Sequence, residues 1–263
     1  MNKNKKIITI IIPTRNRVSY IRKIVSVIEK FKKYIDIIII DDFSLKYQRI
    51  ELSKFTKTKK FIKLFLLNDN RGQSYACNYG LSYARTKYVW FFDDDDYLKK
   101  ETLLKVINYL KLFSVDGLLI PMRRIYKDKI LNYTVPNKKD HTFDSLKNSP
   151  QKVSTSCAIF KLAKIKKIKG WDEKLFGGTD TDLFLRFSEK NKFSILKTYP
   201  VIVNFSAPDR VTNKFLRQQI AKIYFLNKHW SILTLKRRIY YIISFILCFP
   251  ILNSLKSKLK IFS

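Results

Sequence analysis

The sequence is poor in the residues that usually hold metals or form cross-links. It contains only 3 cysteines and 2 histidines in 263 residues. Cys77, Cys157 and Cys248 lie far apart and match neither a zinc-binding spacing nor a disulfide framework, which favours a reducing cytoplasm. His141 and His229 are isolated, so each is expected to be a surface or packing residue rather than a ligand.

Long apolar segments are also absent. The N-terminal apolar stretch ends at Pro13 and is too short for the core of a signal peptide. After Trp230, an apolar run of about fourteen residues lies between basic segments, and a spanning helix needs roughly twenty. We therefore predict a domain over residues 1–230 and an amphipathic tail over 231–263. The tail helix should start near Leu235 and either lie on an anionic membrane surface or complete the core.

Acidic residues are scarce: 21 Asp and Glu stand against 53 Lys and Arg, which gives a net charge of +32. Such a charge predicts attraction to nucleic acid, phosphorylated substrates or a membrane surface. The lysines are spread along the whole chain, as an AT-rich genome would also produce. No nucleic-acid-reading motif is recognisable, so no specific nucleic-acid partner is expected.

Runs typical of buried strands alternate with amphipathic, helix-like segments. Strands are expected at residues 6–13, 35–42, 61–69, 87–96 and 115–126, and helices at 18–31, 72–85 and 100–113. Residues 137–152 are polar and are expected to form a loop or lid. The alternation predicts an α/β fold with a largely parallel sheet.

The few acids concentrate where predicted strands end. Asp41–Asp42 follow one strand, and the four aspartates Asp93–Asp96 follow another. Ligands bind at the carboxyl ends of parallel strands, and alternation places Asp93 and Asp95 on the same side. Paired carboxylates suit Mg²⁺ or Mn²⁺, with diphosphate oxygens as further ligands. The alternative is a solvated acidic loop that caps the helix starting near Glu101.

Four blocks occur in the order and spacing of glycosyltransferase family 2, whose members are inverting enzymes of the GT-A fold. The blocks are IITIIIPTRNR, IIIIDDFS, NDNRGQSYACNYGLSYARTKYVWFFDDDD and GWDEKLFGGTDTDLFLRF, and the resemblance covers roughly residues 7–190. It implies a Rossmann-like, mostly parallel sheet flanked by helices. It also implies transfer of a sugar from a nucleotide-sugar, with a UDP-sugar favoured.

The resemblance further implies donor-binding roles for matching residues. Asp42 would bind the uracil edge, Arg71 would lie along the nucleotide, and Asp93 would face the ribose. Asp95 would bind Mn²⁺ or Mg²⁺. The full donor-binding set is Thr14, Arg15, Asp42, Arg71, Asp93 and Asp94.

Asp180 occupies the position of the catalytic base. Inversion requires a carboxylate that accepts the proton of the acceptor hydroxyl, while a metal stabilises the departing diphosphate. Asp182, Asp172 and Glu173 are competing acids. The other interpretation of Asp180 is a cap on the helix that follows Gly178.

Three further residues are candidates for acceptor contacts or support of the site: Trp171, Asp182 and Arg186. Trp171 either stacks on an acceptor sugar or belongs to the core, and Arg186 stands at the family's usual arginine. The chain departs from the family at Thr179, where an acid is common, and at Cys77, where an arginine is frequent. No Q-x-x-R-W element follows Asp180, which argues against a processive synthase.

Two other functions compete with this one. A sugar nucleotidylyltransferase would carry a glycine-rich phosphate loop after the first strand, but residues 13–20 contain no glycine. A non-catalytic basic protein that binds membranes or nucleic acid would leave the ordered acids unexplained. The expected acceptor is a lipid-linked glycan, as in lipopolysaccharide, capsule or O-antigen assembly. The enzyme would then be peripheral at the cytoplasmic face of the bacterial inner membrane.

Overall fold

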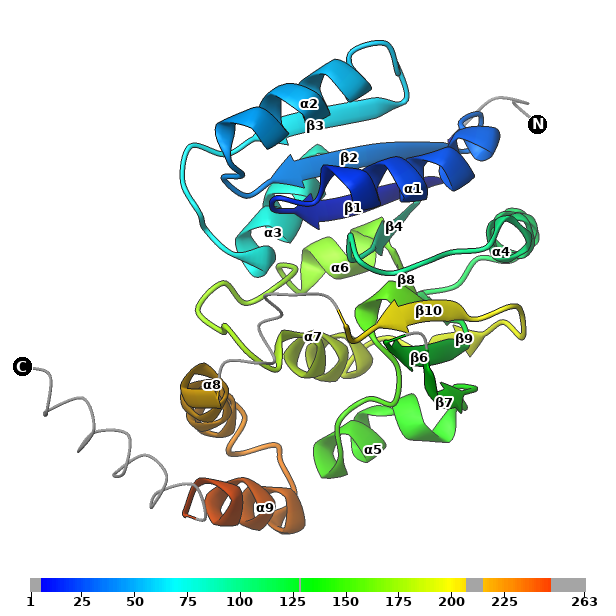
Figure 1. Ribbon diagram of the computed structural model, residues 1–263. Coiled ribbons are helices and arrows are strands. Elements are labelled where there is room, and N and C mark those ends of the chain that lie inside the picture. The colour runs from blue at the N-terminus through cyan, green and yellow to red at the C-terminus, as the bar shows by residue number, and fades with distance from the viewer. Residues whose placement is uncertain (1–5, 128, 207–214, 247–263) are drawn as a thin grey trace, which may run out of the picture.

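The computed structural model describes residues 6–127, 129–206 and 215–246. A seven-stranded sheet runs through it in the order β3-β2-β1-β4-β8-β5-β9 (Figure 1). Its strands are β1 (Ile8–Thr14), β2 (Ile35–Asp41), β3 (Ile62–Leu66), β4 (Tyr88–Phe91), β5 (Gly117–Leu119), β8 (Ala158–Lys161) and β9 (Phe193–Ile195). Every neighbouring pair is parallel except those that involve β8. The predicted α/β fold with a mostly parallel sheet is therefore confirmed.

A second sheet of three strands lies beside the first. It contains β6 (Met122–Tyr126), β7 (Lys129–Thr134) and β10 (Val201–Asn204), in the order β10-β6-β7. The prediction of one strand over 115–126 is wrong, because β5 ends at Leu119 and β6 starts in the other sheet. Pro121 lies between them and has no N–H to donate to a ladder, which favours a break there.

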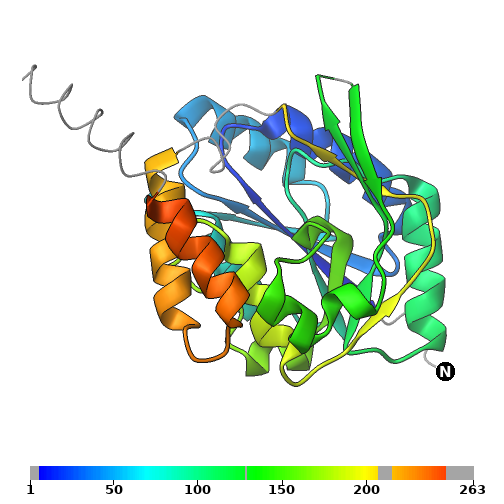
Figure 2. The ribbon, with the colours of Figure 1, turned by 90° about the horizontal axis from the view of Figure 1, so that it is seen from below.

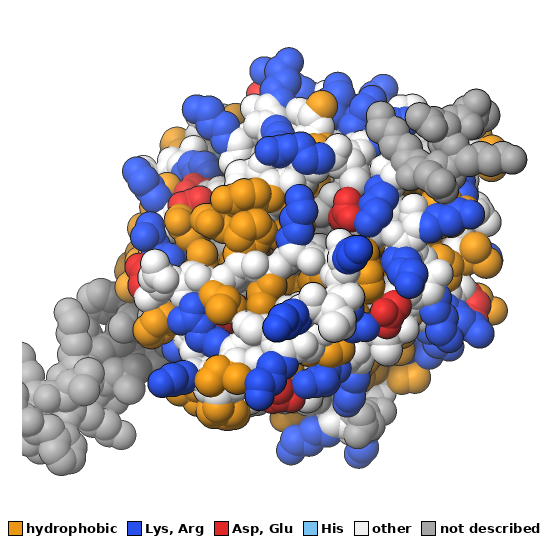
Figure 3. All heavy atoms as spheres, turned by 90° about the horizontal axis from the view of Figure 1, so that it is seen from above, with side chains coloured by type: hydrophobic (Ala, Val, Ile, Leu, Met, Phe, Trp, Pro, Cys, Tyr) orange, Lys and Arg blue, Asp and Glu red, His pale blue; other side chains and the backbone are white. Residues whose placement is uncertain are grey.

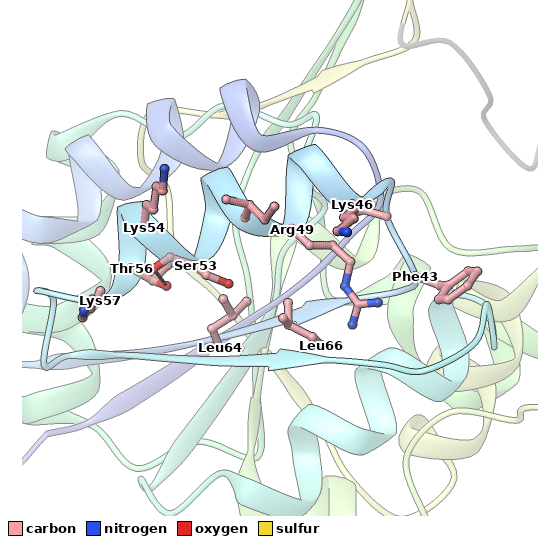
Figure 4. A pocket seen from close by; sticks show the side chains of 11 residues that line it. Phe43, Lys46, Arg49, Ser53, Lys54, Thr56, Lys57, Leu64 and Leu66 are labelled. Atoms are coloured by element: carbon pink, nitrogen blue, oxygen red, sulfur yellow. Dashed lines mark hydrogen bonds between the residues drawn. The ribbon is translucent and has the colours of Figure 1, made fainter.

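Helices cover both faces of the larger sheet. They are α1 (Val18–Ile28), α2 (Lys46–Thr56), α3 (Gln73–Tyr83), α4 (Lys100–Leu112), α5 (Phe143–Asn148), α6 (Leu162–Lys167), α7 (Thr179–Ser188), α8 (Phe215–Lys228) and α9 (Leu235–Ile246). Short 3₁₀ helices are η1 (Glu29–Phe31), η2 (Lys139–His141) and η3 (Thr155–Cys157). On β3, Phe65 packs 4.3 Å from the Tyr83 ring of α3, whereas Leu64 faces α2 (Figure 4). Since successive strand residues point to opposite faces, α2 and α3 lie on opposite sides of the sheet.

The predicted helices correspond to α1, α3, α4, α7 and α9, whereas α2, α5, α6 and α8 were not expected. α2 buries only Leu52 and Thr56, so it has little of the apolar stripe that predicts a helix. The segment 137–152 is not a simple loop, since it contains η2 and α5. Thr142 caps α5 by accepting a hydrogen bond from the Ser145 N–H at 3.2 Å, and Leu146 is buried.

The core lies where α3 packs directly on β1. The isoleucines of β1 and β2 are almost completely buried. A Cβ atom at Gly80 would lie 2.6 Å from Cγ2 of Ile11, so this close approach requires glycine. Cys77 and Cys157 are buried, unpaired thiols, as expected. Cys248 falls outside the described residues.

In the described part of the chain, no helix is long and apolar enough to cross a membrane. α9 starts at Leu235, where the tail helix was predicted, and packs beside α8 and α5 (Figure 2). Residues 247–263 of the predicted tail lie outside the described residues. The division at residue 230 stays a prediction.

Candidate active site

The carboxyl ends of β2, β1 and β4 meet at one edge of the sheet. Thr14 is in register with Asp41, and Ile11 is in register with Phe91. Continuing the β1–β4 register by three residues brings Asp94 level with Thr14. The Thr14 hydroxyl donates a hydrogen bond to Asp94 Oδ2 at 2.7 Å. The structure thus brings predicted donor-site residues from separate strands together.

Arg17 offsets the charge of the aspartate run and was not predicted. Its Nη1 donates to Asp94 Oδ1 at 2.7 Å and lies 3.4 Å from Asp95 Oδ2. Burial raises the pKa of Asp94 to about 6, while the cation of Arg17 and the hydroxyl of Thr14 oppose this rise. Asp94 therefore links β1 to the start of α1. Its predicted contact with the donor stays a prediction.

Asp42 organises the loop that leads into α3. Its two carboxylate oxygens accept hydrogen bonds from the backbone N–H groups of Arg71 at 2.7 Å and Gly72 at 2.9 Å. With its amide oriented to satisfy both neighbours, Asn70 donates to Asp42 and accepts from Arg15, each at 2.8 Å. The structure brings these three predicted donor-site residues into one network, through an asparagine that we had not singled out.

Arg71 presents its cation at the surface beside this loop. Its guanidinium lies 4.4 Å from the centre of the Tyr75 ring and 3.6 Å from Asp69, and both charged side chains are about half exposed or more. A guanidinium stacked in this way keeps donors available for phosphate oxygens. This position fits the predicted role along a nucleotide.

The η3 segment brings Asp93 and Asp180 together from opposite halves of the chain. The Asp93 N–H donates to the Ser156 hydroxyl at 3.1 Å, and the Thr155 N–H donates to Asp180 Oδ2 at 3.1 Å. Asp93 also accepts a hydrogen bond from the Gln73 side chain at 2.7 Å. Adjacent residues of one short segment therefore contact the predicted ribose-binding acid and the predicted base.

Two buried thiols, Cys77 and Cys157, lie in the electrostatic field of the acids at this edge of the sheet. Burial raises the pKa of Cys77 and of Cys157 well above the usual value, and the negative charges of Asp93 and Asp180 raise both further. Cys77 stands where the family frequently has an arginine. This chain therefore has a neutral, buried side chain at that position.

Asp180 lies at the N-terminal end of α7. The N-cap residue of this helix is Gly178, whose φ of 65° is in the left-handed region that glycine adopts without strain. Asp180 follows in the first turn, and its Oδ2 accepts a hydrogen bond from the Thr155 N–H. The two predicted roles of Asp180, catalytic base and helix cap, stay predictions.

Both carboxylate oxygens of Asp182 accept hydrogen bonds. It accepts from the Arg186 guanidinium at 2.5 and 2.8 Å on one oxygen, and from Lys228 at 2.6 Å and His229 at 2.8 Å on the other. Its side chain is fully buried. Although burial opposes it, hydrogen bonds from His229 and Arg186 hold the pKa of Asp182 well below its usual range. The network favours a structural role over proton acceptance.

The other competing acids also have partners. Asp172 accepts from Lys228 at 2.6 Å, and Glu173 accepts from the Asn78 amide at 2.7 Å. Burial would raise the pKa of Asp172, but the hydrogen bond from Lys228 and the further contacts lower it overall. Neither acid contacts η3 among the hydrogen bonds of the described residues.

Arg186 fixes the backbone in front of Trp171. Its guanidinium donates to the carbonyls of Ile168 at 2.7 Å and Gly170 at 2.8 Å. The Trp171 ring is 4% exposed and packs edge-to-face on Phe91 at 5.3 Å. This placement favours the core interpretation of Trp171 over stacking on a sugar.

The acids at the β4 end fit a divalent cation held mainly by substrate. In the described ranges, no three His, Cys, Asp or Glu side chains are grouped closely enough to hold a metal ion by themselves. Asp93 and Asp95 supply hard oxygen donors at the end of β4. Mg²⁺ and similar ions commonly bind one or two carboxylates and take further ligands from phosphates. The donor set matches this kind of site.

Arg17, Asn70, Gln73 and the η3 residues were missed for a common reason. Each acts through a contact with a residue that is distant in sequence, and no local spacing marks such a contact. Only Arg17 had a weak sequence signal, because it lies in the segment TRNR that directly follows the predicted strand.

Known proteins share both sequence and fold with this chain. A family model described as Glycosyl transferase family 2 matches residues 9–169. The Bacillus subtilis (strain 168) protein "Minor teichoic acid biosynthesis protein GgaB" is 30% identical over 134 residues, which are 49% of this chain and 15% of that protein. This chain thus corresponds to only a small part of that relative.

Solved structures show the same architecture. S. aureus TarS 1-349 in complex with UDP-GlcNAc has a TM-score of 0.65 at 20% identity, over 84% of this chain and 67% of that one. Mannosyltransferase PcManGT from Pyrobaculum calidifontis, in complex with GDP-Man and Mn²⁺, has a TM-score of 0.63 at 16% identity, over 86% and 65% of the two chains. These likenesses show a shared fold of the GT-A type. Since the family model covers more than half of its length, the chain belongs to glycosyltransferase family 2.

Proposed function

We propose that the protein is an inverting glycosyltransferase that moves a sugar from a UDP-sugar to a hydroxyl of a bacterial surface glycan. The contact of Asp180 with η3, which also accepts a hydrogen bond from the Asp93 N–H, carries this proposal, because a carboxylate on that segment fits the role of the base. The two structural neighbours contain UDP-GlcNAc and GDP-Man, which supports a nucleotide-sugar donor.

The described residues suit the steps of such a transfer. The Asp42 network would position Arg71, whose cation would contact the donor phosphates. Asp180 would accept the proton of the acceptor hydroxyl as its oxygen bonds to the sugar carbon and the bond to the diphosphate breaks. Asp95, with Asp93 beside it, would hold a divalent cation, which would neutralise charge on the departing diphosphate. Asp182 and Arg186 would keep α7 in place.

The acceptor that we infer is a wall polymer of the teichoic acid type. The printed name of the B. subtilis relative supports this inference, although the chain matches only 15% of that protein. We further infer that α9 holds the enzyme at the cytoplasmic face of the membrane, where lipid-linked polymers are built. The apolar residues of α9 that face outward support this placement.

The test is release of UDP from a panel of UDP-sugars with Mn²⁺ and an acceptor. Asp180→Asn should bind donor normally but lose transfer by at least about a hundredfold, because only proton acceptance is removed. Asp95→Ala should lose the part of donor binding that a chelator also removes. Asp144→Asn removes an acid that is 87% exposed and belongs to none of the predicted site residues, and it should behave as the wild type. Near-normal transfer by Asp180→Asn would reassign the base, and no UDP release from any donor would contradict the proposal.

A further inference from the structure

An open groove lies between α2 and the edge strand β3 (Figure 4). Its volume is about 770 Å³, within the range of ligand-binding pockets. The groove is lined by Phe43, Ser44, Lys46, Arg49, Ile50, Ser53, Lys54, Thr56, Lys57, Leu64 and Leu66. No acidic residue is among them.

The floor of the groove is apolar and reachable from solvent. Leu66 is 38% exposed, Phe43 is 46% exposed and Ile50 is 47% exposed. Phe43 also has a φ of 63°, an uncommon conformation for a bulky side chain. The small contact of α2 with the sheet therefore leaves an apolar surface that a ligand can cover.

Cations line the groove along one face of α2. Lys46, Arg49, Lys54 and Lys57 follow one another over twelve residues, so they span about 16 Å at the rise of an α-helix. Arg49 is partly neutralised, since it lies 3.4 Å from Asp41 and donates to the Leu67 carbonyl.

The lysines of this face carry charge that the protein does not neutralise. Lys46, Lys54 and Lys57 are exposed, and within the described ranges none of them forms an ion pair. In Figure 4, Lys46 and Lys57 stand toward opposite ends of the groove. Figure 3 looks onto this side of the molecule and shows many blue Lys and Arg side chains and few red acids. A linear anion with repeated charges complements this row.

We propose that the groove binds the phosphodiester-linked polyol chain of the acceptor. Its phosphates would pair with the three lysines, and its carbon chain would cover the apolar floor with hydroxyl partners such as Ser53. Phe43 is the only aromatic side chain that lines the groove, whereas proteins that bind single-stranded nucleic acid stack successive bases on several rings. This inference rests on the proposed function.

The position of the groove relates it to the active site. Phe43 and Ser44 directly follow Asp42, so one end of the groove adjoins the predicted donor site. A polymer held there keeps its growing or modified units at a high local concentration near Asp180. The groove is thus a second binding site for a polymeric acceptor, separate from the site where its hydroxyl reacts.

The test uses a fluorescently labelled, synthetic glycerol phosphate hexamer and fluorescence anisotropy at low salt. The triple variant Lys46→Gln, Lys54→Gln and Lys57→Gln should bind the hexamer at least tenfold more weakly than the wild type. The matched control is Lys190→Gln, Lys192→Gln and Lys197→Gln, which removes the same charge next to β9 at the opposite edge of the sheet. The control should change the affinity less than twofold. UDP-sugar binding should be equal in all three proteins.

Two results would overturn the assignment. Equal weakening by both triple variants would show that the overall charge, and not the groove, attracts the hexamer. Binding of a DNA hexamer with the same number of phosphates that is as tight, and as sensitive to the groove variant, would show a general anion surface. If the wild type binds the hexamer but releases no UDP from any UDP-sugar, the proposed function is contradicted. The groove would then remain a polyol phosphate site.

Discussion

At the scale of single residues, His141 is a titratable group placed in an apolar environment. It is 2% exposed, and its ring lies 6.1 Å from the Phe184 ring and 6.3 Å from the Phe193 ring. Nδ1 lies 3.1 Å from the Asn137 carbonyl. Burial lowers the pKa of His141, while that carbonyl and Asp140 oppose the change and Lys152 adds to it. The folded protein therefore favours the neutral imidazole.

His141→Leu should make stability less dependent on pH in mildly acidic solution. Below about pH 6.5 the unfolded chain binds a proton at this histidine that the folded chain resists, so the wild type loses stability as pH falls. Melting temperatures at pH 7.5 and 5.5 measure the effect. At pH 7.5 the variant should melt at a lower temperature than the wild type, because the Asn137 carbonyl loses its hydrogen-bond donor. At pH 5.5 the difference between the two melting temperatures should be smaller. An unchanged difference at the two pH values would show that the imidazole titrates normally.

Single residues also show what sequence reasoning could predict. That Asp42 and Asp95 lie at one edge of the sheet follows from strand ends and alternation, which are local patterns. Their partners are not local: Arg71 is 29 residues from Asp42, and Ser156 is 63 residues from Asp93. Such distant partners also decide which acids, like Asp182, have both carboxylate oxygens hydrogen-bonded. The partners that distinguish Asp182 from Asp180 could therefore be found only with the structure.

At the scale of elements, one buried carboxylate joins α7 to α8. Asp182 on α7 binds Arg186 one turn later, and Lys228 at the end of α8 with His229 just beyond it. Arg186 in turn fixes the backbone before Trp171. A buried acid with charged partners is costly to remove, because its partners are left without compensation.

Asp182→Asn should lower the free energy of unfolding by about 3 kcal/mol or more. Urea unfolding at pH 7 measures this loss, with Asp144→Asn as the exposed control, for which a change below about 0.5 kcal/mol is expected. Because the pKa of Asp182 is held low, its contribution is complete at neutral pH and is lost only in strong acid. Normal stability combined with lost transfer in Asp182→Asn would identify Asp182 as the base instead of Asp180.

Several elements that were predicted correctly have a strong local pattern. β1 and β2 are runs of isoleucine buried on both faces, and α1 buries a regular apolar stripe. α2 buries only Leu52 and Thr56, so its sequence carries little of that signal. The lack of an apolar stripe explains both why α2 was not predicted and why it packs weakly on the sheet. The weak packing leaves the groove between α2 and β3.

At the scale of the whole molecule, α9 has its apolar residues outside and a cation inside. Arg237 is 2% exposed, donates to the Leu146 carbonyl, and lies 5.2 Å from the centre of the Phe225 ring. The outward residues of α9 are 39 to 69% exposed: Leu235, Ile239, Tyr240, Ile242, Ile243 and Ile246. α9 has no acidic residue, and Figures 1 and 2 both place it at the periphery. These features match a helix that lies in the interface of an anionic membrane.

The 263-residue chain should float with vesicles that contain anionic lipid, and much less with purely zwitterionic vesicles, because the net charge of +32 adds attraction only to the former. Ile239→Ser with Ile243→Ser should reduce the bound fraction at least tenfold. Each isoleucine is about half exposed, so its burial in lipid contributes about 1 kcal/mol or more. The matched control is Leu104→Ser with Leu112→Ser on α4, which removes two exposed apolar side chains elsewhere and should float as the wild type does. Circular dichroism of each variant checks that the fold is kept. Equal flotation of both folded double variants would show that α9 is not the surface that meets the membrane.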